Sequence, residues 1–236
     1  MKTKNRIWLY PFIVMGLVLI LTNSCGDKEK IKDNIDPSAI TDKDGNVYTS
    51  VTIGTQIWMV ENLKTTKYND NTNIPLVSDN DEWAALSEPA YCWYNNYATN
   101  KNDHGALYNW YAVNTGKLCP TGWHVPTDAE WTILTTFLGG ESVAGGKLKE
   151  TGTTHWYDPN TGATNETGFT ALPCGSRNYD GPFEATDQIR FDVYWWTPST
   201  DVDYMAIARY VNYYESGIYP WELIKEHGMS VRCVKD

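Results

Sequence analysis

The hydrophobic and polar positions divide the chain into one apolar run near the N-terminus and a much longer mixed region. The apolar run covers residues 7–21 and follows a short start that holds three basic residues and no acidic one. Small polar residues come directly after it. A charged start, an apolar centre and small residues before a cleavage point are typical of a secretory signal peptide. The run is also shorter than the ~20 residues that a membrane-spanning helix needs. We therefore predict that residues 1–24 are a signal peptide and that the mature chain is exported.

The mixed region begins with a polar, charged stretch. We predict a flexible tether over residues 25–40 and one folded domain over residues 41–236, which is long enough to bury a hydrophobic core. Near the start of this domain, residues 47–53 alternate with period two, Gly54 and Thr55 form a turn, and a second β-like run returns over residues 56–60. This pattern predicts a β-hairpin.

Helical spacing predicts three helices. The best defined begins after Thr127, because Thr127 and Glu130 have the spacing of a capping box. It ends at Gly139. Shorter helices are predicted over residues 81–86 and 107–113.

The second half of the chain is β-like, with long polar loops rich in Gly, Asn, Asp and Thr. Strands are predicted over residues 168–172, 193–197, 205–211 and 229–234. Few strong helices together with several antiparallel-type strands predict an α+β fold.

Charge narrows the possible partners. Removal of the signal peptide takes away three basic residues and no acidic one, so the net charge falls from −10 to −13. Such a surface repels nucleic-acid phosphates, which argues against nucleic-acid binding. It offers no basic patch for anionic lipid either, so we expect contact with a membrane only through a covalent anchor.

Aromatic composition points to a binding surface. The chain has 11 Trp and 16 Tyr but only 5 Phe, and many of them lie with Asn, Asp, Ser and Gly in residues 175–224. Rigid aromatics and small polar residues are the composition of recognition surfaces, and sugars are held by aromatic faces with carboxylates and amides. The candidate ligand-binding residues are Arg177, Tyr179, Asp180, Trp196, Tyr213, Tyr214 and Trp221. Packing is the competing explanation, and since Trp195 and Trp196 alternate in a strand, we expect one of the two in the core.

Catalytic and metal-binding patterns are weak. The four histidines have no metal-ligand spacing, and we interpret His124 as structural. Asp42, Asp44 and Asn46 have the spacing of calcium-loop oxygens, but no downstream Glu stands at the right distance, so a turn is favoured. No nucleophile elbow or phosphate loop is present in the sequence. We therefore expect no enzyme activity, no cofactor and no bound metal.

Cys25, directly after the signal peptide, resembles the acceptor cysteine of a bacterial lipoprotein. Leu21 lies four residues before it and Thr22 three, so the usual Leu is displaced by one position. The resemblance implies a diacylated Cys25 that anchors the chain, in the outer membrane, facing either outward or into the periplasm. The alternative is an ordinary secretory signal, with Cys25 free or disulfide-bonded.

An ordered set of strings in the domain resembles the Fibrobacter succinogenes major paralogous domain, a family of exported and lipid-anchored bacterial proteins. The strings are residues 56–63, 105–113, 118–127, 130–131, 168–173, 194–196 and 230–233. The resemblance covers about residues 41–236 and implies a tethered domain.

A more distant resemblance, to formylglycine-generating enzymes, rests on residues 126–131 and 228–233. It implies a C-type-lectin-like fold, with two helices packed on a twisted antiparallel sheet, long loops and neighbouring chain ends. Those enzymes hold copper with a nearby cysteine pair in the C-terminal half. Here that half has only Cys174 and Cys233, so the activity is not implied. The familiar lectin calcium tripeptides are also absent from the sequence.

Four cysteines remain after Cys25, which suggests two disulfides and allows three pairings. We favour Cys119 with Cys233, which ties the helix region to the last strand and contributes about 4–5 kcal/mol in the chain-entropy model. Cys92 and Cys174 are then the second predicted pair. The resembled family often has Gly at position 174, and the alternative is therefore a free, buried Cys92.

These observations predict a lipid-anchored cell-envelope protein that displays a non-catalytic binding module for a glycan or protein ligand. Two alternatives remain open at this point. One is an enzyme derived from the formylglycine-generating fold, and the other is a structural envelope protein without a soluble ligand.

Overall fold

The computed structural model describes residues 39–183 and 188–236. The predicted signal peptide, Cys25 and the predicted tether as far as residue 38 lie outside the described residues. Within the described part, no helix is long and apolar enough to cross a membrane.

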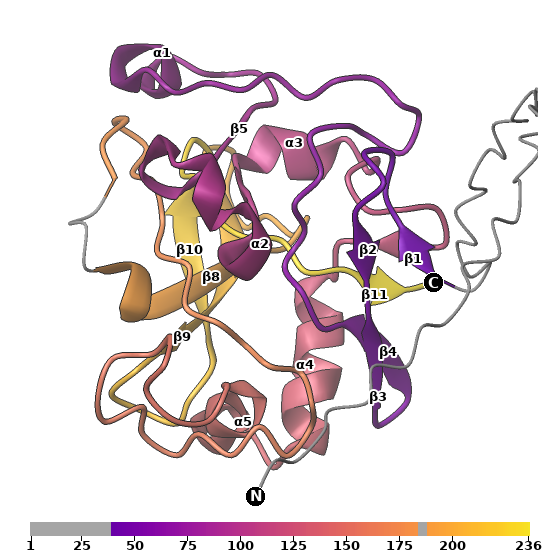
Figure 1. The fold of residues 1–236 in the computed structure, drawn as a ribbon, viewed down its shortest axis with the longest axis vertical. Coiled ribbons are helices and arrows are strands. Elements are labelled where there is room, and N and C mark those ends of the chain that lie inside the picture. The colour runs from indigo at the N-terminus through magenta and orange to yellow at the C-terminus, as the bar shows by residue number, and fades with distance from the viewer. Residues whose placement is uncertain (1–38, 184–187) are drawn as a thin grey trace, which may run out of the picture. The chain divides into compact units, whose positions relative to one another are not determined.

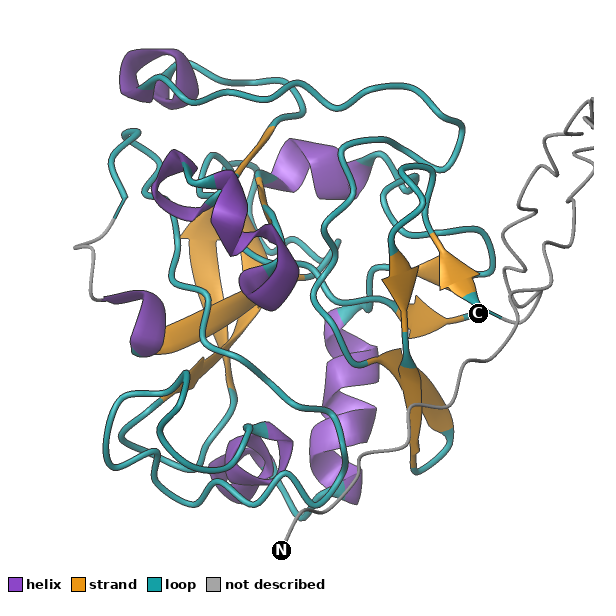
Figure 2. Cartoon of the chain, viewed as in Figure 1, coloured by secondary structure: helices purple, strands orange, loops and turns teal. Residues whose placement is uncertain are grey.

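The described chain is built from short helices and strands joined by long loops, which Figure 2 shows as the largest share of the trace. The strands are β1 (Ile40–Thr41), β2 (Val47–Tyr48), β3 (Ser50–Ile53), β4 (Gln56–Met59), β5 (Tyr91–Cys92), β6 (Leu107–Tyr108), β7 (Trp123–His124), β8 (Asp192–Trp196), β9 (Met205–Asn212), β10 (Tyr219–Ile224) and β11 (Val234–Lys235). The α-helices are α1 (Asn80–Ala84), α2 (Lys101–His104), α3 (Trp110–Asn114), α4 (Asp128–Phe137) and α5 (Glu141–Leu148). Short 3₁₀ turns lie at Tyr94–Asn96, Ala98–Asn100 and Gln188–Arg190.

The strands form antiparallel sheets. One has the order β3-β4-β11-β7, one has the order β10-β9-β8, and the pairs β1-β2 and β5-β6 complete the set described. Helices and antiparallel sheets in one chain confirm the α+β class. The predicted hairpin is confirmed as β3–β4, in which Ile53 pairs with Gln56 around Gly54 at φ +61°.

Helix α4 begins and ends as its sequence predicts. The Thr127 hydroxyl accepts a hydrogen bond from the Glu130 N–H, and the Glu130 carboxylate accepts one from the Thr127 N–H at 2.8 Å, so the capping box is formed. Gly139 and Gly140 follow the helix at positive φ. In Figure 1 α4 runs alongside the β3–β4 hairpin, and the Gln56 side chain donates to the Glu130 carbonyl at 3.0 Å.

Three local predictions differ from the structure. Of the strand predicted over residues 229–234, only Val234 lies in a strand, β11, and Met229 and Ser230 form isolated bridges to Tyr108 and Trp195. The helix predicted over residues 107–113 is split, because Asn109 caps α3 by accepting from the Ala112 N–H, and Leu107–Tyr108 before it pair with β5. The strand predicted over residues 168–172 is mostly loop, with a single bridge from Ala171 to Lys149.

The three-stranded sheet is buried on both faces at its centre. Trp196, Ala206 and Ala208 face one hydrophobic cluster, whereas Trp195 and Val211 face the other. The second cluster includes buried side chains of both longer helices, namely Trp131 and Leu134 of α4 and Ala144 and Leu148 of α5. Both tryptophans are therefore core residues, which corrects the prediction that only one of them is.

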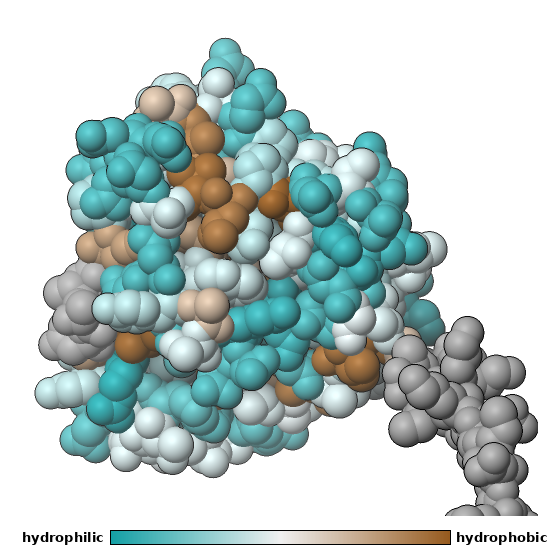
Figure 3. Space-filling view, turned by 45° about the horizontal axis from the view of Figure 1, so that its top comes forward, coloured by the Kyte–Doolittle hydropathy of each residue, from teal (hydrophilic) through white to brown (hydrophobic). Residues whose placement is uncertain are grey.

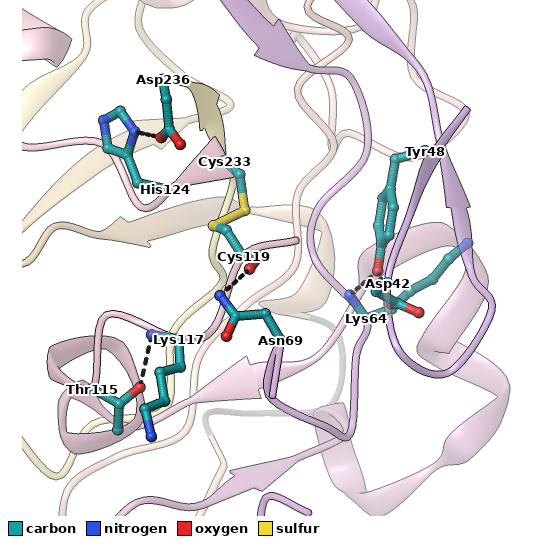
Figure 4. The surroundings of a disulfide bond; sticks show 10 residues. All are labelled: Asp42, Tyr48, Lys64, Asn69, Thr115, Lys117, Cys119, His124, Cys233 and Asp236. Atoms are coloured by element: carbon teal, nitrogen blue, oxygen red, sulfur yellow. Dashed lines mark hydrogen bonds and ion pairs between the residues drawn. A yellow bond between two sulfur atoms is a disulfide. The ribbon is translucent and has the colours of Figure 1, made fainter. Parts of the chain in front are cut away.

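The disulfide between Cys119 and Cys233 is confirmed, with its Cα atoms 6.1 Å apart. Figure 4 shows it between the loop before β7 and the segment before β11, and the Asn69 side chain donates to the Cys119 carbonyl beside it.

The predicted Cys92–Cys174 disulfide is wrong, because both residues are free, buried thiols in the structure. They lie in different hydrophobic clusters. Cys92 packs with Trp83, whereas the Cys174 sulfur accepts a hydrogen bond from the Asn62 amide at 2.9 Å. Burial raises the pKa of each thiol to about 12, so both stay protonated at neutral pH.

Candidate binding surface

Arg177 and Trp196, two of the predicted ligand-binding residues, are fully buried. The Arg177 guanidinium lies 4.4 Å from the ring centre of Trp83 and donates to backbone carbonyls, including that of Gly181 at 2.6 Å and that of Val77 at 2.7 Å. The Trp196 indole donates to the Tyr108 carbonyl at 2.9 Å. Both predictions are therefore corrected: Arg177 holds loops together and Trp196 fills the core.

Tyr179 and Asp180 are exposed but lie apart from the predicted aromatic residues Tyr213 and Tyr214. The Tyr179 ring is 5.3 Å from that of His227, which lies in the turn after Ile224, the last residue of β10. Tyr210, whose hydroxyl lies near that of Tyr214, pairs instead with Tyr219, the first residue of β10. The structure thus places Tyr179 and Asp180 at one end of this strand and the remaining aromatic residues along the strand and at its other end.

A row of aromatic rings crosses the three-stranded sheet on one face. Tyr194 pairs directly with Tyr210, and their ring centres are 4.5 Å apart. Trp221 pairs with Ala208, so its side chain shares the face of Tyr210, and these two ring centres are 5.9 Å apart. Strand register alone therefore brings together three rings from three strands.

A second group of rings lies at the end of the same sheet. The rings of Tyr157, Phe191 and Tyr213 contact one another, with centres 5.1–5.4 Å apart. Tyr213 also contacts Tyr214 at 5.3 Å, and the Tyr214 hydroxyl interacts electrostatically with that of Tyr210.

The two groups thus meet where Tyr214 lies near Tyr210, and we call them together the aromatic strip. Its members are Tyr157, Phe191, Tyr194, Tyr210, Tyr213, Tyr214 and Trp221. Three members are strongly exposed: Tyr157 at 45%, Tyr214 at 56% and Trp221 at 53%. The others are partly buried, so they hold the exposed rings in place.

Polar groups border the aromatic strip near its centre. The Asn212 side-chain oxygen accepts hydrogen bonds from the backbone N–H groups of Tyr214 and Glu215, and its amide donates to the Glu215 carboxylate. Burial raises the pKa of Tyr210, and the nearby Tyr214 hydroxyl and the charge of Asp192 raise it further. Tyr210 therefore keeps a neutral hydroxyl that can both donate and accept.

Lys149 supports the turn that carries Tyr213 and Tyr214. Its fully buried ammonium donates to three backbone carbonyls, those of Thr161 at 2.9 Å, Asn212 at 3.0 Å and Glu215 at 2.9 Å. Burial lowers its pKa to about 8. Sequence reasoning missed both Lys149 and Tyr157, because nothing in their local pattern shows that they meet a turn more than fifty residues away.

The other polar candidates are satisfied within the fold. His124 contacts the carboxylates of Glu130 at 2.8 Å and Asp236 at 2.7 Å, which agrees with a structural role. The Asp42 carboxylate accepts from the backbone N–H groups of Asp44 and Asn46, as expected for a turn. Among residues 39–183 and 188–236, no group of three or more His, Cys, Asp and Glu is arranged to hold a metal ion.

Figure 3 shows that one face of the domain is mostly hydrophilic, with hydrophobic residues in small separate groups. Amphipathic rings, which combine a large apolar body with a polar tip, suit such a surface because they offer contact area without a large aliphatic patch.

The fold and the aromatic strip together define an α+β domain with an exposed aromatic face on an antiparallel sheet. The model of the Fibrobacter succinogenes major domain matches residues 51–235, which is most of the chain, and the chain belongs to this family. No curated protein and no solved structure matches the chain.

Proposed function

We propose that this chain is a lipid-anchored protein of the cell envelope whose domain presents the aromatic strip as a non-catalytic binding surface for a glycan or a protein. The observation that carries this proposal is the continuity of seven rings over four segments of chain, with three of them about half exposed. Rings held by packed neighbours lose little freedom on binding, so each gives much contact area at a small entropic cost.

The anchor is the second part of the proposal. Signal removal would leave Cys25 as the acylated first residue, tethered to the outer membrane by the residues before Ile40. The acidic composition supports attachment through lipid rather than through a charged surface. Radiolabelled palmitate should enter the wild-type chain and not Cys25→Ser; equal labelling of the two would contradict the anchor.

We also propose that the domain is C-type-lectin-like. Two features support this architecture: α4 and α5 contribute to one core cluster with the β8–β9 sheet, and the first and last described strands lie close together. The latter follows because Ile40 and Trp123 line one cleft and Trp123 pairs with Lys235. Folds of this kind carry many unrelated functions, so the aromatic strip rather than the fold supports binding.

Glycan and protein arrays probed with the wild-type protein, Tyr214→Ala and Trp221→Ala test the binding surface. We expect ligands bound by the wild type to be lost by both variants. The matched control is Tyr97→Ala, which removes a ring that is 64% exposed outside the aromatic strip and should bind as the wild type does. Tyr179→Ala tests the separate group at the other end of β10, and we expect it to behave as the control. If both Tyr214→Ala and Trp221→Ala still bind the ligands, the aromatic strip is not the binding site.

A further inference from the structure

A shallow groove lies on the other face of the same sheet, directly beyond Trp221. Its volume is about 660 Å³. It is lined by Asp128, Met205, Ile207, Pro220, Trp221 and Glu222. Pro220 and Glu222 flank Trp221 in β10, so their side chains point to the opposite face.

The groove and the aromatic strip are separated only by one strand. The order β10-β9-β8 makes β10 the edge of this sheet. Trp221, which is 53% exposed, both contacts Tyr210 of the aromatic strip and lines the groove. A chain-like ligand lying across β10 therefore meets one continuous surface, with Trp221 at the crossing.

The charge of this surface argues against an anionic ligand. The charged residues lining the groove are Asp128 and Glu222, both acidic. Asp128 is held in place by the buried guanidinium of Arg209, whose Nε donates to it at 2.8 Å, while Glu222 is exposed. Glu215 adds a carboxylate beside the strip. Because Arg209 offsets the charge of Asp128, the carboxylates that would repel an anion are Glu222 on one face and Glu215 beside the strip.

The edge strand also disfavours a protein that binds by adding a strand. Pro220 lacks a backbone N–H, and Glu222 places a charge on the same edge. Both features disfavour the pairing of another strand with β10. A neutral sugar chain fits better, since its C–H faces can lie on aromatic rings while its hydroxyls donate to carboxylates and to the Tyr hydroxyls.

We propose that the aromatic strip and the groove form one track for a neutral polysaccharide, which crosses the edge strand β10 over Trp221. This inference rests on the proposed function of the aromatic strip as a binding surface, and it adds the ligand class and a second subsite.

Affinity electrophoresis of the full chain tests the ligand class. Native gels contain either a neutral polymer (dextran, mannan, galactomannan or xyloglucan) or an anionic one (alginate or polygalacturonate). We expect at least one neutral polymer and no anionic polymer to retard the wild type. Trp221→Ala should lose the retardation. Retardation by anionic polymers alone, or strip-dependent array binding to proteins alone, would overturn the glycan inference and leave the binding surface standing. Absence of both retardation and strip-dependent array binding would overturn both.

Isothermal titration with oligosaccharides of increasing length, cut from the polymer that is retained, tests the second subsite. Glu222→Ala should weaken binding of the longest oligosaccharides about fivefold or more and leave the shortest unchanged, because only long chains reach the groove. Glu88→Ala is the matched control, since Glu88 is an exposed acid outside the track. Equal affinities of the wild type and Glu222→Ala for oligosaccharides of every length would show that the groove is not a second subsite. Matching thermal unfolding of each variant and the wild type separates lost binding from lost folding.

Discussion

Loss of the Cys119–Cys233 disulfide should strongly destabilise the domain. The two cysteines are 114 residues apart, so the bond closes most of the domain into one loop. In the chain-entropy model a loop of that length restricts the unfolded chain by about 5 kcal/mol at 25 °C. The total free energy of unfolding of a domain is only about 5–15 kcal/mol. The change should therefore lower the melting temperature by roughly 10–20 °C.

Guanidinium denaturation followed by tryptophan fluorescence measures this effect in a Cys119→Ser, Cys233→Ser double variant. The matched control is Cys92→Ala, which removes a buried free thiol and opens no loop. It should therefore lower the free energy of unfolding clearly less than the double variant does. Alkylation of the unfolded, unreduced wild type should label Cys92 and Cys174 and spare the bonded pair. A double variant that loses under about 1 kcal/mol, or a different labelling pattern, would refute this reasoning.

Three further substitutions test buried polar contacts. Lys149→Met should lower the free energy of unfolding by about 3 kcal/mol or more, because three carbonyls lose their donor. Since the folded pKa of Lys149, about 8, lies below its ordinary value near 10.5, the unfolded chain binds the proton more tightly, and the wild type should gain stability over the variant as pH rises from about 8 toward 10. Arg177→Lys should cost about 3 kcal/mol in urea denaturation without changing ligand binding by the folded protein. Thr127→Ala should cost about 1 kcal/mol in the same assay, through loss of the helix cap.

Local patterns allowed the elements near residues 47–60 and 127–140 to be predicted from the sequence. A two-residue turn between alternating runs and a capping box are complete within a few residues, so no distant contact is needed to interpret them. The chosen disulfide was predicted too, because it joins the helix region to the last strand.

Helix α5 was missed because its Gly145 and Gly146 argue against a helix. In the structure these glycines have a packing role: a Cβ on Gly145 would overlap the Gly217 carbonyl, and one on Gly146 would overlap that of Gly162. The helix thus lies against loops far along the chain, and that contact is not visible in the local sequence.

Arg177 was misplaced for a related reason. A guanidinium among Tyr, Asn and Asp is normally an exposed group, but here loops around Val77 and Gly181 supply enough carbonyls to satisfy it inside the domain. Lys149 is buried in the same way. The aromatic residues of the site were predictable in part, since Tyr213, Tyr214 and Trp221 were chosen from composition, but only strand pairing shows that Tyr210 joins them.

The most direct test of the aromatic strip is the affinity of Trp221→Ala, measured by titration with a ligand that the wild type binds on the arrays. Truncation of a central aromatic residue of an interface typically costs about 2 kcal/mol or more. We therefore predict at least a tenfold loss of affinity, with Tyr97→Ala within twofold of the wild type. Equal affinities of Trp221→Ala and the wild type would contradict the claim that this surface binds the ligand.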